Sequence, residues 1–482
     1  MKFRSGQYFI PFVFVLMLST NAVLAQLTTS NFTNPADFGF LPTESGINNT
    51  KALQAAVDKG GTINISKIGT YKIAGTVYIG DSTSLVFGDG TSLEKSAENG
   101  KYGYVFLNKG ALTKTYNYHI SIIGLNLKVN EVDTWMGEVY GDRGHVSFIW
   151  VKDLKIERFR CNDLAAGQFC IQVCTFEDLL INDVIIKGKK DAIHLGRGKR
   201  FRISNGVFQT ADDAIALAAG DWISGNPELG DIEDGLIENC YDLKADKLEG
   251  AFAKIVPAAW VDWKPNIEVR HGDAVVSNGK IYRVLAALDG KVYKSITAPS
   301  FTETSKEIDG IKWMLHQTDT FHTAVIRNVT FRDIYLESIR VPFQIMCYDN
   351  NYSHSYYKGA KLPVLGGIHL DNITVLSNNK KHLVNVSTPL DILTITNSTL
   401  KDNGIEFRQG RDMDEYLKTN ISITNNVFTS GGNYTVVKNN VPGKVVSLKT
   451  SGNMATGENF SAMVDQGPGK VLVESDLMGL KK

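Results

Sequence analysis

Residues 178–208 read DLLINDVIIKGKKDAIHLGRGKRFRISNGVF. Two segments of this stretch, 178–186 and 200–208, share one pattern, in which branched apolar residues alternate with polar ones around a central isoleucine. Alternation with a period of two, rich in Ile, Val and Phe, is typical of a β-strand and not of a helix. The stretch therefore predicts two similar strands about one repeat apart.

The pattern returns along most of the chain. The central apolar residues of the recurring segments are Ile156, Ile181, Ile203, Ile237, Phe331, Leu370, Ile395 and Ile423. A strand pattern that recurs every ~20–30 residues predicts a solenoid, because one turn cannot bury its own inner face whereas stacked turns share a core. A large β-sandwich is the alternative, but sandwich strands recur at about 8–12 residues.

An Asn or Asp follows most of these central residues at the same offset. Such residues suit a tight bend, where left-handed backbone geometry and side-chain capping are tolerated. Stacked bends of this kind also predict a ladder of Asn side chains along one side of the solenoid.

Two further segments complete the predicted architecture. Residues 46–61, GINNTKALQAAVDKGG, predict a short helix capped by Asn49 or Thr50, which would cover the open end of the solenoid. Residues 256–320 lie in an interval too long for one turn and predict a small inserted β-rich module. Its aromatic residues, Trp260, Trp263, Tyr282 and Trp313, either form the core of that module or stack on sugar rings.

Composition restricts the class of protein. The 482 residues are 43% hydrophobic and 21% charged, which is typical of a globular chain. Lys plus Arg and Asp plus Glu number 51 each, a balance that argues against a nucleic-acid or membrane-surface partner. The first residues show a basic end, an apolar run and small residues before Ala25, so we expect a signal peptide cut after Ala25 and a secreted or periplasmic protein with no membrane span.

The predicted organisation follows from these segments. It comprises a signal peptide (1–25), an N-terminal cap and first β-helix part with an acidic site (26–255), the insertion (256–320), a second β-helix part (321–445) and a C-terminal tail or cap (446–482).

Three aspartates are spaced by about one turn of this solenoid. Asp191 precedes Asp212 and Asp213 by a little over twenty residues, and neighbouring turns stack at about 4.8 Å. The three carboxyls should therefore form one patch in which at least one pKa rises, as general acid and base catalysis of glycoside hydrolysis requires. Alternatively, they cap turns or pair with the nearby cations Lys187, Lys189, Lys190, Arg197, Lys199, Arg200 and Arg202.

The segments KDAIHL (190–195) and TADDAIAL (210–217) resemble the paired motifs of the polygalacturonase family of glycoside hydrolases. Residues 326–350 resemble later coils of that family, with Tyr348 near a substrate-lining tyrosine, and residues 52–73 resemble the opening of the pectate-lyase-like superfamily. The resemblance implies an all-β, right-handed parallel β-helix, with Asp212 as general acid and with Asp191 and Asp213 activating water for inversion.

The chain departs from that family in two places. Residues 225–239 contain no counterpart of its Gly-His-Gly motif, and its Arg-x-Lys element has only Lys254 as a loose equivalent. A glycan other than polygalacturonate is therefore equally compatible.

Four residues are candidates for substrate binding besides Tyr348. His194 and Lys254 would contact the substrate, Trp222 would stack on a sugar ring, and Arg197 would pair with a uronate or sulfate. Each also has a structural interpretation, as a buried, packed or solvated residue.

We thus expect an exported glycoside hydrolase acting on a polysaccharide or oligosaccharide, pectin-like or otherwise acidic, without metal or cofactor. One alternative is a polysaccharide lyase in which the three aspartates bind Ca²⁺. Another is a solenoid that binds glycans without cleaving them.

Overall fold

The computed structural model describes residues 32–135, 137–221, 225–286, 289–318, 321–347, 354–378, 381–410, 418–429 and 431–474. The predicted signal peptide, Trp222 and Tyr348 lie outside these residues. Within the described ranges, no helix combines the length and apolar character needed to cross a bilayer.

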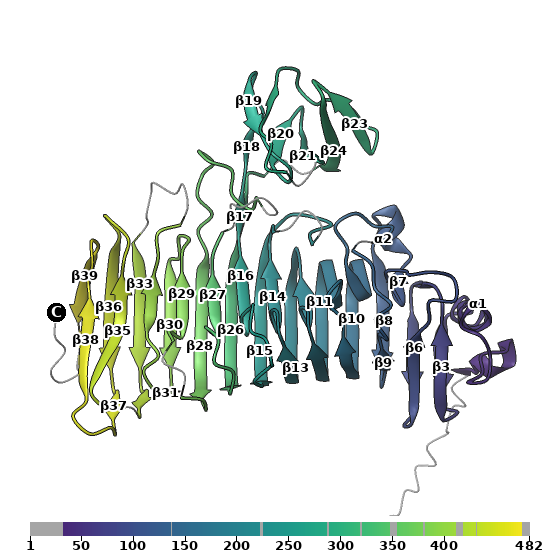
Figure 1. The fold of residues 1–482 in the computed structure, drawn as a ribbon, viewed down its shortest axis with the longest axis horizontal. Coiled ribbons are helices and arrows are strands. Elements are labelled where there is room, and N and C mark those ends of the chain that lie inside the picture. The colour runs from purple at the N-terminus through teal and green to yellow at the C-terminus, as the bar shows by residue number, and fades with distance from the viewer. Residues whose placement is uncertain are drawn as a thin grey trace, which may run out of the picture.

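The chain winds into a long coil of short parallel strands (Figure 1). Each strand pairs with its counterpart one coil further along, which produces three ladders. The first ladder contains β1 (Phe32–Thr33), β2 (Gly61–Ile65), β5 (Thr83–Phe87), β8 (Asn117–Ile123), β10 (Gly144–Leu164), β11 (Phe169–Gly188), β13 (Gly198–Thr210), β15 (Ile232–Asp242), β26 (Ile326–Leu336), β28 (Gly366–Val375), β30 (Ile392–Thr396), β33 (Thr419–Thr424), β36 (Val445–Ser451) and β39 (Lys470–Glu474).

The second ladder carries the candidate site. Besides the first parts of β10 and β11, it contains β4 (Val77–Ile79), β7 (Phe106–Asn108), β12 (Ile193–Leu195), β14 (Ile215–Ala218), β16 (Ala253–Val256), β27 (Phe343–Ile345), β29 (Val384–Val386), β32 (Ile405–Phe407), β35 (Asn433–Asn439) and β38 (Ser461–Asp465). The third ladder contains β3 (Gly69–Ile73), β6 (Thr91–Lys95), β9 (Asn126–Lys128), the later parts of the long strands, β31 (Thr399–Leu400), β34 (Val427–Phe428) and β37 (Met454–Ala455).

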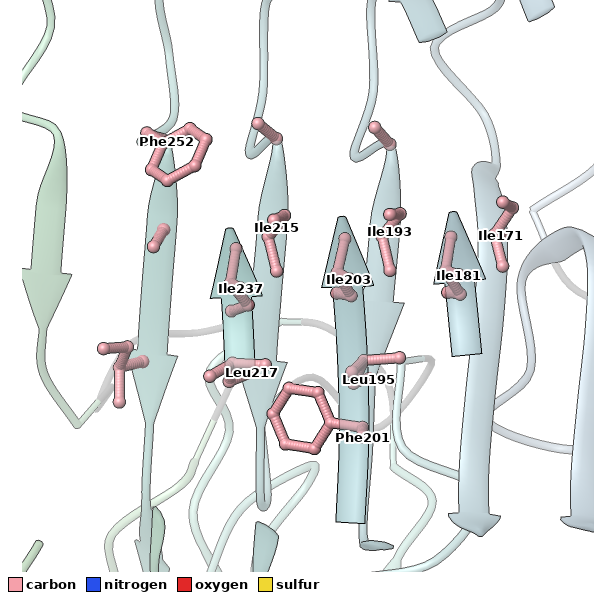
Figure 2. Packing of buried hydrophobic residues seen from close by; sticks show 14 of the residues in the cluster. Ile171, Ile181, Ile193, Leu195, Phe201, Ile203, Ile215, Leu217, Ile237 and Phe252 are labelled. Atoms are coloured by element: carbon pink, nitrogen blue, oxygen red, sulfur yellow. The ribbon is translucent and has the colours of Figure 1, made fainter. Parts of the chain in front are cut away.

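The eight apolar positions found in the repeat are successive rungs of the first ladder. Ile156 pairs with Ile181, Ile181 with Ile203, and the register continues in the same way to Ile423. All eight side chains are buried, and Figure 2 shows Ile181 and Ile203 in one such row inside the coil. The predicted solenoid and its register are therefore confirmed.

The bends after these rungs have the predicted left-handed geometry. Positive φ angles occur at Asp183, Asn205, Asn239, Asp333, Asn372, Asn397 and Asn425, each two residues after a rung. Asn205 Nδ2 donates to Asn182 Oδ1 at 2.7 Å, and Asn239 Nδ2 donates to Asn205 Oδ1 at 2.6 Å. Short polar side chains thus support the bend and connect neighbouring coils.

Replacing Asn205 by valine should destabilise the protein by about 1–2 kcal/mol, because a β-branched side chain is strained at its φ of +57°. Asn205→Gly keeps the backbone freedom and loses only the side-chain bonds, so its loss should be smaller. Denaturant midpoints measure both. Equal stability of Asn205→Val and the parent would contradict this account of the bend.

A helix covers the N-terminal end of the coil, as predicted. Helix α1 (Gly46–Val57) follows the 3-10 helix η1 (Pro35–Phe38) and buries Leu53 and Val57. Its N-cap is Ser45, whose hydroxyl accepts from the Asn48 N–H, and not Asn49 or Thr50. Asn49 lies inside the helix, where its side chain bonds the backbone of Leu41.

A separate group of sheets interrupts the coil between Ile237 and Phe331, which still pair directly. It projects from one side of the coil (Figure 1) and is entered through β17 (Ala258–Ala259) and left through β25 (Thr323–Ala324). The remaining strands are β18 (Val261–Asp262), β19 (Ile267–Val269), β20 (Ala274–Ser277), β21 (Lys280–Val284), β22 (Tyr293–Ser295), β23 (Ser305–Ile308) and β24 (Ile311–Gln317). Tyr282 and Trp313 are fully buried in its core, so the structure favours the core interpretation for them.

The C-terminal region differs from the prediction. Strands β36 and β39 pair in parallel with the preceding coils, as do β37 and β38. The coil therefore continues past the boundary predicted at 445/446 and reaches Glu474. These later strands are part of the same sheet and bury Val446, Leu448 and Val464.

Candidate active site

The three aspartates of the sequence pattern meet on the second ladder, at the start of two consecutive strands. Ile193 of β12 pairs with Ile215 of β14, and the Ala192 N–H donates to the Asp213 carbonyl at 3.0 Å. Asp191 and Asp213 therefore lie at the same level on neighbouring coils. One oxygen from each of the Asp191, Asp212 and Asp213 carboxylates lies within 4.8 Å of the other two.

Three basic side chains contact this acidic cluster. Lys190 Nζ contacts the Asp212 carboxylate and lies 3.8 Å from Asp191 Oδ1. Lys254 Nζ, on β16, lies 3.3 Å from Asp213 Oδ2. His194 Nδ1 lies 3.0 Å from Asp191 Oδ2. The carboxylates are thus both crowded together and individually supported by cations or hydrogen bonds.

The environment separates the acidities of two of these carboxyls. Burial and the charges of Asp191 and Asp213 raise the pKa of Asp212 to about 7, although Lys190 opposes the shift. Burial also raises the pKa of Asp191, but the hydrogen bond from His194 and the charge of Lys190 outweigh it and hold that pKa well below its usual range. Such a pair, one carboxyl protonated near neutral pH and one ionised, is the arrangement of an acid and a base.

The third carboxyl, Asp213, is fixed most firmly. Its Oδ1 accepts the Ala251 N–H at 2.8 Å while Lys254 contacts its other oxygen. Burial raises its pKa, and Lys254 opposes this. Asp213 is therefore held in one orientation by two coils.

Access differs among the three. The side chains of Asp191 and Asp213 are almost fully buried, whereas that of Asp212 is 18% exposed. Asp212 is thus the carboxyl through which the cluster meets solvent. Asp191 Oδ1 and His194 Nε2 are buried and form no hydrogen bond with any residue in the described part of the chain.

Arg340 is a site residue that sequence reasoning missed. Its guanidinium donates to the Asp212 carbonyl at 2.6 Å and to the Thr210 carbonyl at 3.2 Å, and it pairs with the buried Asp242. It thereby fixes the turn that presents Asp212. Arg340 is far from Asp212 in the sequence and precedes β27, so only the register of the coils brings the two together.

The structure places the remaining candidates differently. His194 and Lys254 contact the cluster, as described. Arg197 follows β12, whereas Asp191 precedes it, so the strand lies between the two residues. Arg197 lines a cavity of about 340 Å³ with Tyr116 and Phe321. Trp222 and Tyr348 lie outside the described residues.

The donor set does not fit a calcium site well. Three carboxylate oxygens lie close enough to share a cation. However, the ammonium groups of Lys190 and Lys254 already contact the Asp212 and Asp213 carboxylates. A Ca²⁺ ion prefers six to eight oxygen ligands and would have to displace these positive charges.

Comparison with known proteins identifies the fold. No family model and no curated protein matches the sequence. The structure is similar to the A-module of a mannuronan C-5 epimerase from Azotobacter vinelandii (13% identity, 92% of this chain and 100% of that chain, TM-score 0.50). It is also similar to the catalytic unit of a GH87 α-1,3-glucanase from Streptomyces thermodiastaticus (12% identity, 94% and 70%, TM-score 0.50) and to a family 28 exopolygalacturonase from Yersinia enterocolitica (12% identity, 89% and 78%, TM-score 0.45).

The fold is a right-handed parallel β-helix. This is the fold implied by the resemblance of the sequence to the polygalacturonase family. At these identities the similarity establishes the fold alone, so the function has to be argued from the site.

Proposed function

We propose that this protein is a glycoside hydrolase that cleaves a glycan by carboxylate acid and base catalysis. One observation carries the proposal. A partly exposed carboxyl with a pKa of about 7, Asp212, lies beside a buried carboxyl, Asp191, whose pKa is held low. Glycoside hydrolysis requires a protonated carboxyl for the leaving oxygen and an ionised one to activate water.

The roles follow from access and charge. Asp212 protonates the glycosidic oxygen, because it is the exposed member and holds its proton near neutral pH. Asp191 and Asp213 hold and deprotonate the attacking water. An oxygen of Asp191 and an oxygen of Asp213 lie within 4.8 Å of each other. One water can therefore donate a hydrogen bond of about 2.8 Å to each of them. His194 and Lys254 keep the two carboxylates oriented.

The proposal also covers the configuration of the anomeric carbon after cleavage. The resemblance implies inversion, yet inverting pairs generally lie about 6.5–9.5 Å apart and retaining pairs about 5–5.5 Å apart. This cluster is tighter than the usual inverting arrangement. We propose inversion through the water shared by Asp191 and Asp213, and proton NMR of the first product anomer decides it.

An acidic glycan is the favoured substrate class. Lys187, Lys189 and Lys190 precede the cluster, and Lys190 reaches it. A uronate carboxylate on the substrate would be attracted to this basic segment.

A panel of polygalacturonate, mannuronan and α-1,3-glucan tests the proposal. Hydrolysis yields new reducing ends without ultraviolet absorption, whereas a lyase yields unsaturated sugars that absorb. Reducing ends alone, lost in Asp212→Asn, would support hydrolysis. Ultraviolet-absorbing products would favour the lyase alternative, and binding without turnover would favour a glycan-binding protein.

The pH profile should follow Asp212. Because this acid works protonated, kcat/KM should fall as the pH rises through about 7. Lys190 lowers the pKa of Asp212, so Lys190→Met should move the alkaline limb to higher pH. Initial rates from pH 5 to 9 measure the alkaline limb of both proteins. An alkaline limb at the same pH in both proteins would contradict the assignment of the acid.

A further inference from the structure

Trp135 is a large aromatic side chain that the structure leaves 52% exposed. It lies between β9 and β10, on the coils that precede the acidic cluster. The Arg143 guanidinium carbon lies 4.0 Å from the centre of the indole ring. One face of the indole is thus backed by a cation, while more than half of the side chain meets solvent.

The two residues before Trp135 are tied to residues 167–168. The Thr134 N–H donates to Gln168 Oε1 at 3.0 Å, and the Gly167 N–H donates to Asp133 Oδ2 at 2.7 Å. A Cβ at Gly167 would lie 2.5 Å from that Asp133 oxygen, so the contact needs a glycine. An exposed indole on a fixed loop is a preorganised surface, which loses little entropy when a ligand binds.

A continuous stack joins this indole to the acidic cluster. Arg143 lies 4.9 Å from the Phe169 ring, and Phe169 stacks on His194 at 4.2 Å with an interplanar angle of 5°. His194 in turn contacts Asp191. Arg143 is 3% exposed. Its Nη2 donates to the Gly167 carbonyl at 2.6 Å, whereas its buried Nε has no hydrogen-bond partner in the described part of the chain.

The charge of Arg143 also interacts with the acidic cluster. Burial lowers the pKa of Arg143, and the negative charges of Asp191 and Asp212 oppose this. The guanidinium thus contacts the Trp135 and Phe169 rings, and its charge interacts with the carboxylates of Asp191 and Asp212. It is a positioning residue, because it acts on a ligand only through the indole.

We propose that Trp135 is a stacking platform for a sugar ring of the glycan chain that Asp212 cleaves. Sugar rings present apolar C–H faces that pack on an aromatic face, and a cation behind that face does not compete for it. The proposal rests on the proposed function and adds a direction to it. The glycan extends from the cleavage point toward the N-terminal coils, away from the inserted sheets that follow β16 (Figure 1).

Binding measurements on Asp212→Asn protein test the platform without turnover. The probes are hexasaccharides of galacturonic acid, of mannuronic acid and of α-1,3-linked glucose, titrated by calorimetry. Trp135→Ala should raise the Kd of a hexasaccharide that binds by about tenfold, and Trp135→Phe by much less, because Phe keeps the flat face. Tyr118→Ala removes an aromatic with 43% exposure from β8 and is the matched control, with no expected change.

In the protein with Asp212 intact, Trp135→Ala should raise KM about tenfold and leave kcat within about threefold. The reason is that the ring contacts a sugar and not the reacting atoms. An unchanged Kd when Trp135→Ala is added to the Asp212→Asn protein would overturn the platform. Failure of every hexasaccharide to bind the Asp212→Asn protein itself would overturn it as well. Full activity of Asp212→Asn would instead overturn the proposed acid, while the KM of Trp135→Ala in the otherwise unchanged protein would still test the platform, so the two failures are distinguishable.

Discussion

Replacing Asp212 by asparagine is expected to lower kcat by about 10²–10⁴-fold, the usual effect of losing a general acid. The amide keeps the shape of the side chain and cannot give up a proton to the leaving oxygen. KM should change little, because Asp212 acts in the transition state more than in substrate binding. Steady-state kinetics on the preferred glycan of the panel measure the loss.

Stability measurements separate chemistry from folding in this variant. The pKa of Asp212 is raised in the folded protein, so its ionised form costs stability near and above neutral pH. Asp212→Asn removes that repulsion and should fold normally. Asp234→Asn is the matched control, because Asp234 is exposed on β15 and has a positive φ, where Asn is also favoured. A fully active Asp212→Asn protein would refute the acid assignment.

Lys254→Met is expected to cause the largest loss of stability, about 3–5 kcal/mol at neutral pH, because it leaves a buried carboxylate without its cation. Methionine keeps the length and apolar stem of the lysine. Asp213 is 2% exposed, so water cannot replace the ammonium group. Guanidinium-induced unfolding at pH 7.5 measures the loss.

The same variant has a defined pH dependence. Burial already raises the pKa of Asp213 in the folded protein above that of an ordinary aspartate, and loss of Lys254 should raise this pKa further. For an acid with a raised folded pKa, the penalty is absent below the unfolded pKa and grows as the pH rises toward the folded pKa. The gap between Lys254→Met and the parent should therefore be small at pH 4 and largest near neutrality.

A surface ion pair provides the control for this prediction. Lys199 lies 3.7 Å from Glu177, and its side chain is 42% exposed. Lys199→Met should change stability little at either pH, because exposed pairs are screened by water. A similar loss in both lysine variants, or a Lys254→Met penalty independent of pH, would contradict the role given to Lys254.

The coil was predictable because its signals are local. Period-two alternation around Ile181 and Ile203, followed by Asn or Asp at the bend, specifies both a strand and a turn within nine residues. The interval between Asp191 and Asp213 then predicted their stacking without knowledge of any other contact. The N-cap was missed because Ser45, Asn49 and Thr50 are all competent caps, and tertiary packing selected Ser45.

The rest of the site depends on contacts between segments far apart in the chain. Arg340 reaches Asp212 only through the register of β14, β16 and β27. Trp135 is marked by its exposure, which a sequence does not display. The sequence pointed to Trp222, which lies outside the described residues and stays a prediction. Arg197 follows Asp191 closely in the sequence, but β12 runs between the two residues. Proximity in sequence is a poor guide across an extended strand.

Hydrolysis in water enriched in ¹⁸O tests the central claim most directly, which is that the Asp191, Asp212 and Asp213 cluster adds water across a glycosidic bond. Mass spectrometry of the products should show one ¹⁸O at each new reducing end, formed by the parent and lost in Asp212→Asn. Cleavage products that carry no ¹⁸O, or labelled products formed equally fast by Asp212→Asn, would contradict the account.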